Sequence, residues 1–532
     1  MYLGIDVGTG SCRAGAFNEQ GDLLGTAKKE IEIFRDGGHI VEQSSENIWY
    51  CVCESVKEVL SKPEISAEQI KGIGFDATCS LVVLDAQDQP LSVSNTGRHH
   101  RNVIVWMDHR ATKQAAQINN TGHRVLDYVG GTISPEMETP KLLWLKENIP
   151  STFEAAGGFF DLTDYLTWRA TGDKSRSVCT VTCKWTYLAH EKTWDASYFE
   201  KIGLGDLTKN NFERIGSKIV EPSKALGHGL TKQSAIDLGL IEGTPVAAGL
   251  IDAHAGGVGT IGAAGAPATS RMAYVFGTSA CTMSSSEAMS FVPGVWGPYY
   301  SAMGPGLWLS EGGQSAAGEA ISHLLKLHPN YEIFNGMAEN KGYSLPDYLL
   351  TLIEERAPVA SDAVWLVEQM IVVPEFLGNR APFAEPDARG IISGLDLNTD
   401  IESLIRLYIA GIFGLGYGLK QILNVQRENG VCPDTVVISG GAGEHPMIKQ
   451  FLADAANIEI AAPSSDEPVL LGSAMLGSVA SGLHSSVLDA MEAMSSLGKV
   501  YRPSKGTIAE THAKRFKVFQ ALQTASRLYR EI

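Results

Sequence analysis

The stretch that decides the fold is Gly4-Ile5-Asp6-Val7-Gly8-Thr9-Gly10-Ser11-Cys12-Arg13. An apolar run over 2–7 leads directly into its glycines, and a second apolar run over 13–17 follows them. This pattern predicts a β-hairpin with a glycine-rich turn. A third run over 23–33 extends it into an antiparallel meander, and the run 81–84 predicts a further strand. Apolar residues at helical spacing predict a helix that opens at 44–46 and runs to 60, and further helices over 315–327, 400–427 and 508–529.

Strands that run into glycine-rich turns return in the second half of the chain. The runs 272–276 and 435–439 lead into Gly277-Thr278-Ser279 and Gly440-Gly441-Ala442-Gly443. Glycine permits a tight turn with uncovered N–H groups, and the hydroxyls add donors, so each turn is suited to bind phosphate. The repetition predicts two related α/β domains that face one another across a cleft. We place them at 1–252 and 253–532.

Two better-known phosphate motifs do not explain these turns. The pattern Gly-x-x-x-x-Gly-Lys-Ser/Thr does not occur in the sequence. The segment 257–262 fits Gly-x-Gly-x-x-Gly, but no acidic residue stands at a later strand end, as a dinucleotide site would need. We interpret this segment as a packing or hinge element.

Three carboxylates stand where chemistry is expected. Asp6 adjoins the first turn, where a metal bound to phosphates needs an oxygen ligand. Asp252 ends the apolar run 245–251 and is either a helix cap or a base for a substrate hydroxyl. Glu311 carries the same ambiguity between a helix cap and a ligand to a polyol.

Composition excludes several classes of protein. The 532 residues contain 43 basic and 60 acidic side chains, a formal charge of −17, which argues against nucleic acid as a polymer partner but not against a nucleotide. Glycine occurs 56 times in 532 residues, about one residue in ten, which is above the usual share of about 7%. The eight cysteines form no Cys-x-x-Cys pair. With no basic leader at the start and no apolar stretch of about 20 residues, a cytoplasmic protein without a membrane span is expected.

With these motifs in place, the chain resembles the FGGY carbohydrate kinases of the actin-like ATPase superfamily. The matching segments occur in the family order over nearly the whole chain: 4–13, 39–43, 106–110, 141–148, 249–254, 276–279, 388–390, 439–442 and 467–472. The resemblance implies two actin-like, RNase H-like α/β domains, each a mixed sheet flanked by helices, with an interdomain cleft. It also implies ATP and Mg²⁺, and phosphoryl transfer to a sugar or polyol hydroxyl, and it leaves a homodimer open.

The resemblance further implies a role for individual residues. Asp252 would be the base that accepts the proton of the attacking hydroxyl, and Asp6 would hold the metal. The residues implied to bind ATP are Asp6, Gly8, Thr9, Gly10, Ser11, Arg13, Gly277, Thr278, Gly318, Gly440, Gly441, Ala442 and His445. Those implied to surround the sugar are Asp76, Thr78, Cys79, Lys184, Asp252 and Glu311.

The segment 78–82, Thr-Cys-Ser-Leu-Val, looks like the mark of D-ribulose-preferring kinases. Lys184 and Glu311 also match the ribulokinases, whereas xylulose kinases usually show Gln-Met-His-Gly at 77–80. We therefore expect D-ribulose, with L-ribulose, D-xylulose and other polyols as alternatives. Cys79 is equally explained as a small buried apolar residue. Two features depart from the family: the Phe-Gly-Gly-Tyr string is replaced near its place by 413–417, and Glu138 stands where a small residue is usual.

Two other classes of function remain as alternatives. An actin-like ATPase that moves filaments or peptides would need no sugar-binding set such as Thr78, Lys184 and Glu311. A glycosidase would use paired carboxylates, for which Asp252 and Glu311 are the candidates. The phosphate turns would then have no role.

Overall fold

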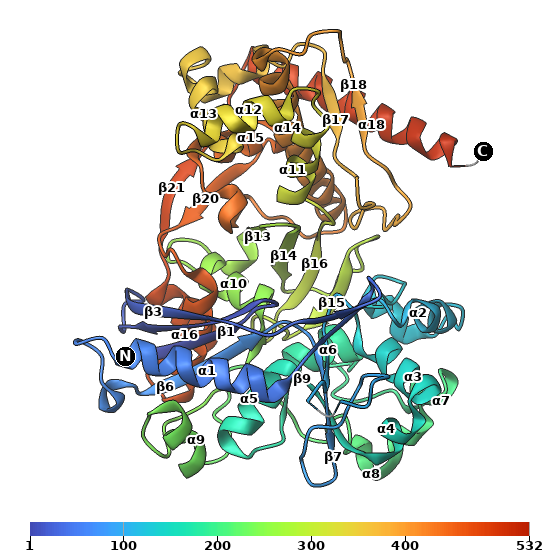
Figure 1. The fold of residues 1–532 in the computed structure, drawn as a ribbon, viewed down its shortest axis with the longest axis vertical. Coiled ribbons are helices and arrows are strands. Elements are labelled where there is room, and N and C mark those ends of the chain that lie inside the picture. The colour runs from blue at the N-terminus through green and yellow to red at the C-terminus, as the bar shows by residue number, and fades with distance from the viewer. Residues whose placement is uncertain (99, 531–532) are drawn as a thin grey trace.

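The computed structural model describes residues 1–98 and 100–530. Figure 1 shows two halves: the N-terminal strands and helices fill the lower part, and a group of helices from the second half of the chain fills the upper part. Strands near the middle belong to the C-terminal half. None of the helices in the described part of the chain is long and apolar enough to cross a membrane.

The first sheet contains the predicted meander. Its strands lie in the order β12-β6-β1-β2-β3. β1 (Tyr2–Val7), β2 (Ser11–Phe17) and β3 (Leu23–Glu30) pair antiparallel. β6 (Gly72–Ala77) joins β1 in parallel, and β12 (Leu250–Ile251) joins β6 in parallel. The predicted helix is α1 (Ser45–Leu60), which packs on β2 and β3.

The N-terminal half also holds a second sheet, of which the sequence indicated one strand. Its order is β4-β5-β8-β7-β9. The bounds are β4 Phe34–Asp36, β5 Ile40–Gln43, β7 Leu81–Asp85, β8 Val103–Ile104 and β9 Ala156–Asp161. The start of β7 matters for the site, because it fixes the segment that connects β6 to β7, residues 78–80.

The C-terminal half repeats the pairing of the first sheet in a sheet of seven strands, β15-β16-β14-β13-β19-β20-β21. The bounds are β13 Arg271–Phe276, β14 Ala280–Ser286, β15 Trp296–Tyr300, β16 Trp308–Gln314, β19 Thr435–Ser439, β20 Glu459–Pro463 and β21 Leu497–Tyr501. β13 pairs antiparallel with β14 and parallel with β19, as β1 does with β2 and β6. The predicted repetition of the strand-and-turn unit is confirmed.

Two small-residue helices pack between these sheets. α10 (Asp252–Ile261) packs on α16 (Pro468–Ala480), α16 packs on β1 and β6, and α10 packs on β13. In Figure 1, α16 (red) lies beside β1 in the lower half, although more than 460 residues separate them in sequence. A Cβ at Gly259 would lie 1.9 Å from the carbonyl oxygen of Pro468. The interpretation of 257–262 as a packing segment is therefore confirmed.

The other predicted helices are also present. α11 (Gly318–Lys326) begins three residues later than expected, while α14 (Ile401–Glu428) and α18 (Thr507–Tyr529) match closely. α11 packs on α14, and α14 packs on α15 (Pro446–Ala456). The C-terminal sheet is thereby covered by an apolar layer of helices that is separate from the core of the N-terminal half.

Candidate active site

The carboxyl ends of three neighbouring parallel strands bring three aspartates to one edge of the first sheet. Asp6 at the end of β1 is the register partner of Asp76 on β6. Asp252 directly follows β12, which pairs with β6. Since parallel strands end at the same edge, residues that are far apart in the sequence meet there.

A cavity of about 300 Å³ opens at this edge, between the two halves of the molecule. It receives the tips of both predicted phosphate hairpins, Gly8 and Thr9 from the first and Ser279 from the second. The other expected site residues that line it are Asp6, Arg13, Thr78, Cys79, Lys184, Asp252 and Glu311. The residues that the sequence analysis assigned to one site are therefore also neighbours in the structure.

Asp76 does not line this cavity. It is fully buried, and its Oδ2 accepts a hydrogen bond of 2.5 Å from Ser473 Oγ of α16. Its Oδ1 has no hydrogen-bond partner among the described residues. Burial and the neighbouring Asp6 raise the pKa of Asp76 well above its usual value. Asp76 therefore supports the floor of the site instead of meeting a ligand directly.

Asp252 has the environment of a base that works near neutral pH. It begins α10, and its Oδ1 accepts a hydrogen bond of 2.7 Å from the N–H of Ala253. Burial and the charge of Asp6 raise its pKa to about 6. A carboxylate with this pKa is ionised at pH 7 yet basic enough to accept a proton from a hydroxyl group in a transition state.

Arg13 joins the first sheet to α16. Its Nε donates to Asp6 Oδ2 at 3.0 Å, and its Nη1 donates to Glu467 Oε2 at 2.7 Å, just before α16 begins. Burial lowers the pKa of Arg13, but Asp6 and Glu467 outweigh it, so the net shift is upward. The guanidinium thus stays charged at the cavity wall.

A chain of polar contacts runs from the cavity wall into the protein interior. Lys184 on α6 (Val178–Trp185) places its Nζ 3.6 Å from Glu311 Oε1. His254 Nε2 lies 3.3 Å from Glu311 Oε2, and His254 Nδ1 lies 3.0 Å from Cys179 Sγ. All of these side chains are buried. Lys184 also lies over the ring of Trp296, with Nζ 4.9 Å from its centroid.

These contacts decide the protonation of Glu311. Burial opposes its ionisation, but Lys184 and His254 outweigh burial and lower the pKa of Glu311 to about 2. Burial likewise acts to lower the pKa of His254, yet Cys179 and Glu311 raise it to about 10. Glu311 lies within strand β16, so the helix-cap alternative for this residue is wrong. A carboxylate held ionised also cannot supply the proton that a glycosidase acid must donate.

The remaining turn residues gather beside the cavity rather than in its wall. The N–H of Gly318 donates to the carbonyl oxygen of Gly277 at 2.9 Å, and a Cβ on Gly318 would lie 3.4 Å from Ala442 Cβ. Gly440 has φ +95°, a conformation that favours glycine. His445 caps α15, its Nδ1 accepting from the N–H of Met447 at 3.2 Å. Gly277, Gly318 and the turn 440–442 therefore form one neighbourhood.

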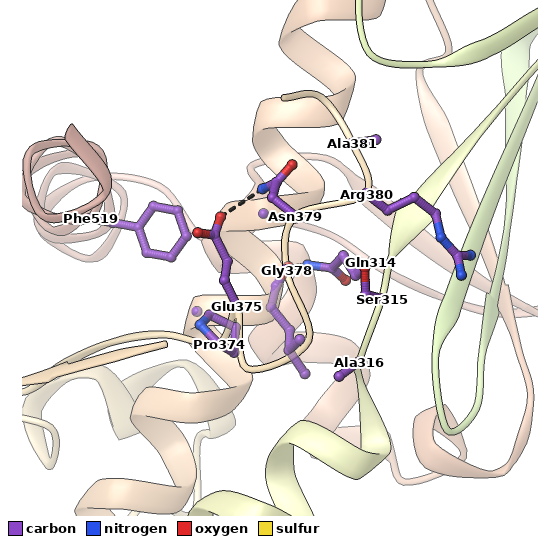
Figure 2. A pocket seen from close by; sticks show the side chains of 13 residues that line it. Gln314, Ser315, Ala316, Pro374, Glu375, Gly378, Asn379, Arg380, Ala381 and Phe519 are labelled. Carbon is purple, nitrogen blue, oxygen red and sulfur yellow. Dashed lines mark hydrogen bonds between the residues drawn. The ribbon is translucent and has the colours of Figure 1, made fainter. Parts of the chain in front are cut away.

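Several lining residues were missed by sequence reasoning: Trp106, Glu136, Cys281, Trp296 and Arg380. Trp106 belongs to a segment that marked the resemblance, whereas no sequence motif pointed to the other four residues as part of the site. Figure 2 shows why Arg380 reaches the site: Asn379 Nδ2 donates to Glu375 Oε1 at 2.6 Å on one side of the loop, and Arg380 points to the other side. A small cavity of about 20 Å³ lies in this loop region, with Phe519 of α18 on its far wall.

Comparisons with known proteins agree with this geometry. The models of the N-terminal and C-terminal domains of the FGGY family of carbohydrate kinases match residues 1–259 and 272–481. An FGGY carbohydrate kinase domain-containing protein of Homo sapiens is 44% identical over 534 residues, which cover 98% of this chain and 96% of that protein. A D-ribulokinase of Saccharomyces cerevisiae is 37% identical over 514 residues, which cover 90% of this chain and 72% of that protein.

Solved structures confirm the expected fold. A xylulose kinase from Brucella ovis has a TM-score of 0.82 at 20% identity, with 99% of each chain covered. The two-domain α/β architecture predicted from the sequence is therefore the architecture of the chain.

Proposed function

The chain belongs to the FGGY family of carbohydrate kinases, and we propose that it transfers the γ-phosphoryl group of ATP to D-ribulose, forming D-ribulose 5-phosphate. Kinases of this family use ATP as co-substrate. The observation that carries the proposal is the cavity that Asp252 shares with the tips of both phosphate hairpins, Gly8-Thr9 and Ser279. The identity to a D-ribulokinase and the segment 78–82 favour D-ribulose over other pentuloses.

Asp252 accepts the proton of the attacking hydroxyl. Its carboxylate is ionised at pH 7 and faces a cavity between the two halves. Phosphoryl transfer needs positioning and charge neutralisation more than covalent help, and the hairpin N–H groups and Arg13 contribute to both. Glu311 accepts hydrogen bonds from the sugar hydroxyls, and Lys184 donates hydrogen bonds to them, because both are charged groups in the cavity wall.

The residues present fit Mg²⁺. Burial first, and then the nearby carboxylates of Asp6 and Asp252, raise the pKa of Asp76, and one buried oxygen of Asp76 has no hydrogen-bond partner among the described residues. This excess of negative charge suits a hard cation with oxygen ligands, and Asp6, which lines the cavity, would hold it. When bound with ATP, the ion neutralises charge on the phosphate groups.

An actin-like ATPase without a sugar substrate is the remaining alternative. Thr78, Lys184 and Glu311, gathered in one cavity wall, have no purpose in such a protein. We also place the protein in a reducing compartment such as the cytoplasm, because its eight cysteines are free thiols.

Sugar dependence of ATP consumption separates the two functions. The pure protein with Mg²⁺ and ATP should release ADP at a rate that depends on an added pentulose. Sugar-independent hydrolysis, with no stimulation by D-ribulose, L-ribulose or D-xylulose, would overturn the proposal.

A further inference from the structure

Three metal-binding side chains meet behind the wall of the cavity. Cys183, His254 and Glu311 each offer one ligand atom, and these atoms all lie within 4.8 Å of one another. A thiolate, an imidazole and a carboxylate are the ligand types that Zn²⁺ takes in proteins. None of the roles given above uses Cys183.

The three ligands stand on regular elements that are themselves buried. Cys183 is on α6, His254 on α10 and Glu311 on β16. Their exposed fractions are 0%, 0% and 6%. Ligands on packed helices and strands keep their positions, so little conformational entropy opposes binding of an ion.

A buried hydroxyl near the cluster is an independent sign that a polar group binds there. Tyr299 is fully buried, and its hydroxyl has no hydrogen-bond partner among the described residues. Burial first, and then the neighbouring Cys183 and Glu311, raise the pKa of Tyr299 well above its usual value. A water or hydroxyl ligand on a metal ion at the cluster would give the Tyr299 hydroxyl the partner that buried polar groups normally have.

The second ring nitrogen of His254 contacts a neighbouring side chain, which fixes the orientation of the ring. A zinc-bound histidine normally uses its other nitrogen to bond a neighbouring group, which fixes the orientation of the ring. Here Nδ1 lies 3.0 Å from Cys179 Sγ, which also accepts from the N–H of Ile251 at 3.4 Å. His254 Nε2 is thereby directed to Glu311.

We propose that Cys183, His254 and Glu311 form a binding site for Zn²⁺, and that the bound ion inhibits the enzyme by competing with the sugar. Three protein ligands leave a fourth position for water, as in zinc sites that are not purely structural. On binding, the Cys183 thiol and the His254 imidazolium each release one proton to solvent, and the ion takes their lone pairs and one of Glu311. No electron is transferred.

Inhibition follows from the double use of Glu311. Its carboxylate lines the sugar cavity and lies near Lys184, and it also belongs to the metal cluster. An ion bound to it removes the acceptor that the sugar needs. This part rests on the proposed function, whereas the binding of the ion does not.

Cobalt substitution tests the site without any assay of activity. Co²⁺ bound to a thiolate absorbs in the near ultraviolet, so titration of the whole protein should produce this band, and Zn²⁺ should abolish it. Cys183→Ala and Cys183→Ser should both lose the band, because two substitutions of different polarity remove the thiolate. Cys432→Ala is the matched control, since Cys432 is the exposed cysteine, and it should keep the band. No band in the unaltered protein, or a band that persists in both Cys183 variants, would overturn the site.

Kinetics test the inhibition. Zn²⁺ should raise the KM for the sugar and leave the KM for ATP unchanged. Cys183→Ala should keep the metal-free activity and need at least about tenfold more Zn²⁺ for the same inhibition. Equal inhibition of the unaltered protein and the variant would contradict the proposal. If no sugar stimulates the unaltered protein, the proposed function fails, and the cobalt titration still decides whether the metal site exists.

Discussion

The imidazole of His254 and the carboxylate of Glu311, 3.3 Å apart, join helix α10 to strand β16 beside the cavity. His254 stands on the helix that Asp252 begins, and Glu311 stands on the C-terminal sheet. The expected base and the expected sugar ligand are therefore held relative to one another through one buried, charge-assisted hydrogen bond.

Substitution of His254 by glutamine or by asparagine distinguishes its contact with Glu311 from its contact with Cys179. The amide nitrogen of Gln approximates Nε2 and can still donate to Glu311, whereas that of Asn approximates Nδ1 and reaches only toward Cys179. A hydrogen bond to a charged group contributes about 1.5–3 kcal/mol. We expect His254→Asn to raise the KM for the sugar about tenfold or more, and His254→Gln to raise it much less. Steady-state kinetics with both substrates varied measures this difference.

The KM for ATP is the internal control for both variants, because His254 does not line the cavity that receives the hairpin tips. Equal losses in the two variants, or a parallel change in the KM for ATP, would show that His254 serves stability alone.

Asp252→Asn removes the proton acceptor with little change of shape. Loss of a general base lowers kcat by about 10²–10⁴-fold. Binding of ATP should remain largely intact, because it uses the hairpins. Single-turnover kinetics together with calorimetric titration of ATP measure both quantities. A variant with near-normal turnover would refute the assignment of Asp252 as the base.

The pH profile tests the environment of the same carboxylate. Its pKa is raised to about 6, so the base is protonated below that pH and ionised above it. At saturating Mg²⁺-ATP, kcat/KM for the sugar should fall about tenfold per pH unit below pH ~6. An unperturbed aspartate would move this limb to about pH 4. An acid limb near pH 4 would contradict the account.

The close contact of α10 and α16 predicts a loss of stability. Gly259→Ala places a methyl group 1.9 Å from a backbone oxygen of Pro468, so one of the helices must shift. Overpacking of this kind costs about 1–3 kcal/mol in the free energy of unfolding.

Gly336→Ala is the matched control for that change. Gly336 lies in α12 (Tyr331–Glu339), and a Cβ there meets no atom within 4 Å. The control should gain about 0.5–1 kcal/mol from the better helix propensity of alanine. Chemical denaturation of both variants gives the comparison, and a Gly259→Ala protein as stable as the control would show that the helices do not pack as described.

Sequence patterns predicted the elements whose apolar residues follow a clear period. β1, β2, β13, β19, α14 and α18 appear close to their expected bounds. Much of the second N-terminal sheet was missed, because strands such as β4 and β8 have only two or three residues and no visible period. Glu311 was ambiguous because glycines follow it, yet those glycines continue strand β16.

The site was predictable to the extent that it follows strand ends and turns. Asp6, Asp252 and the hairpin tips could be derived in this way. Lys184 came only from resemblance, and Arg380 and Trp296 came from neither, because loops and strands far apart in the sequence bring them to the cavity. The relation between His254 and Glu311 depends on the packing of α10 against the C-terminal sheet, which no local pattern encodes.

The central claim is most directly tested by ranking kcat/KM for D-ribulose, L-ribulose and D-xylulose with the pure protein, Mg²⁺ and ATP, with the product identified by phosphorus NMR. The account predicts the highest value for D-ribulose and a product phosphorylated at carbon 5. A higher value for another pentulose, or ADP release without a sugar phosphate, would contradict it.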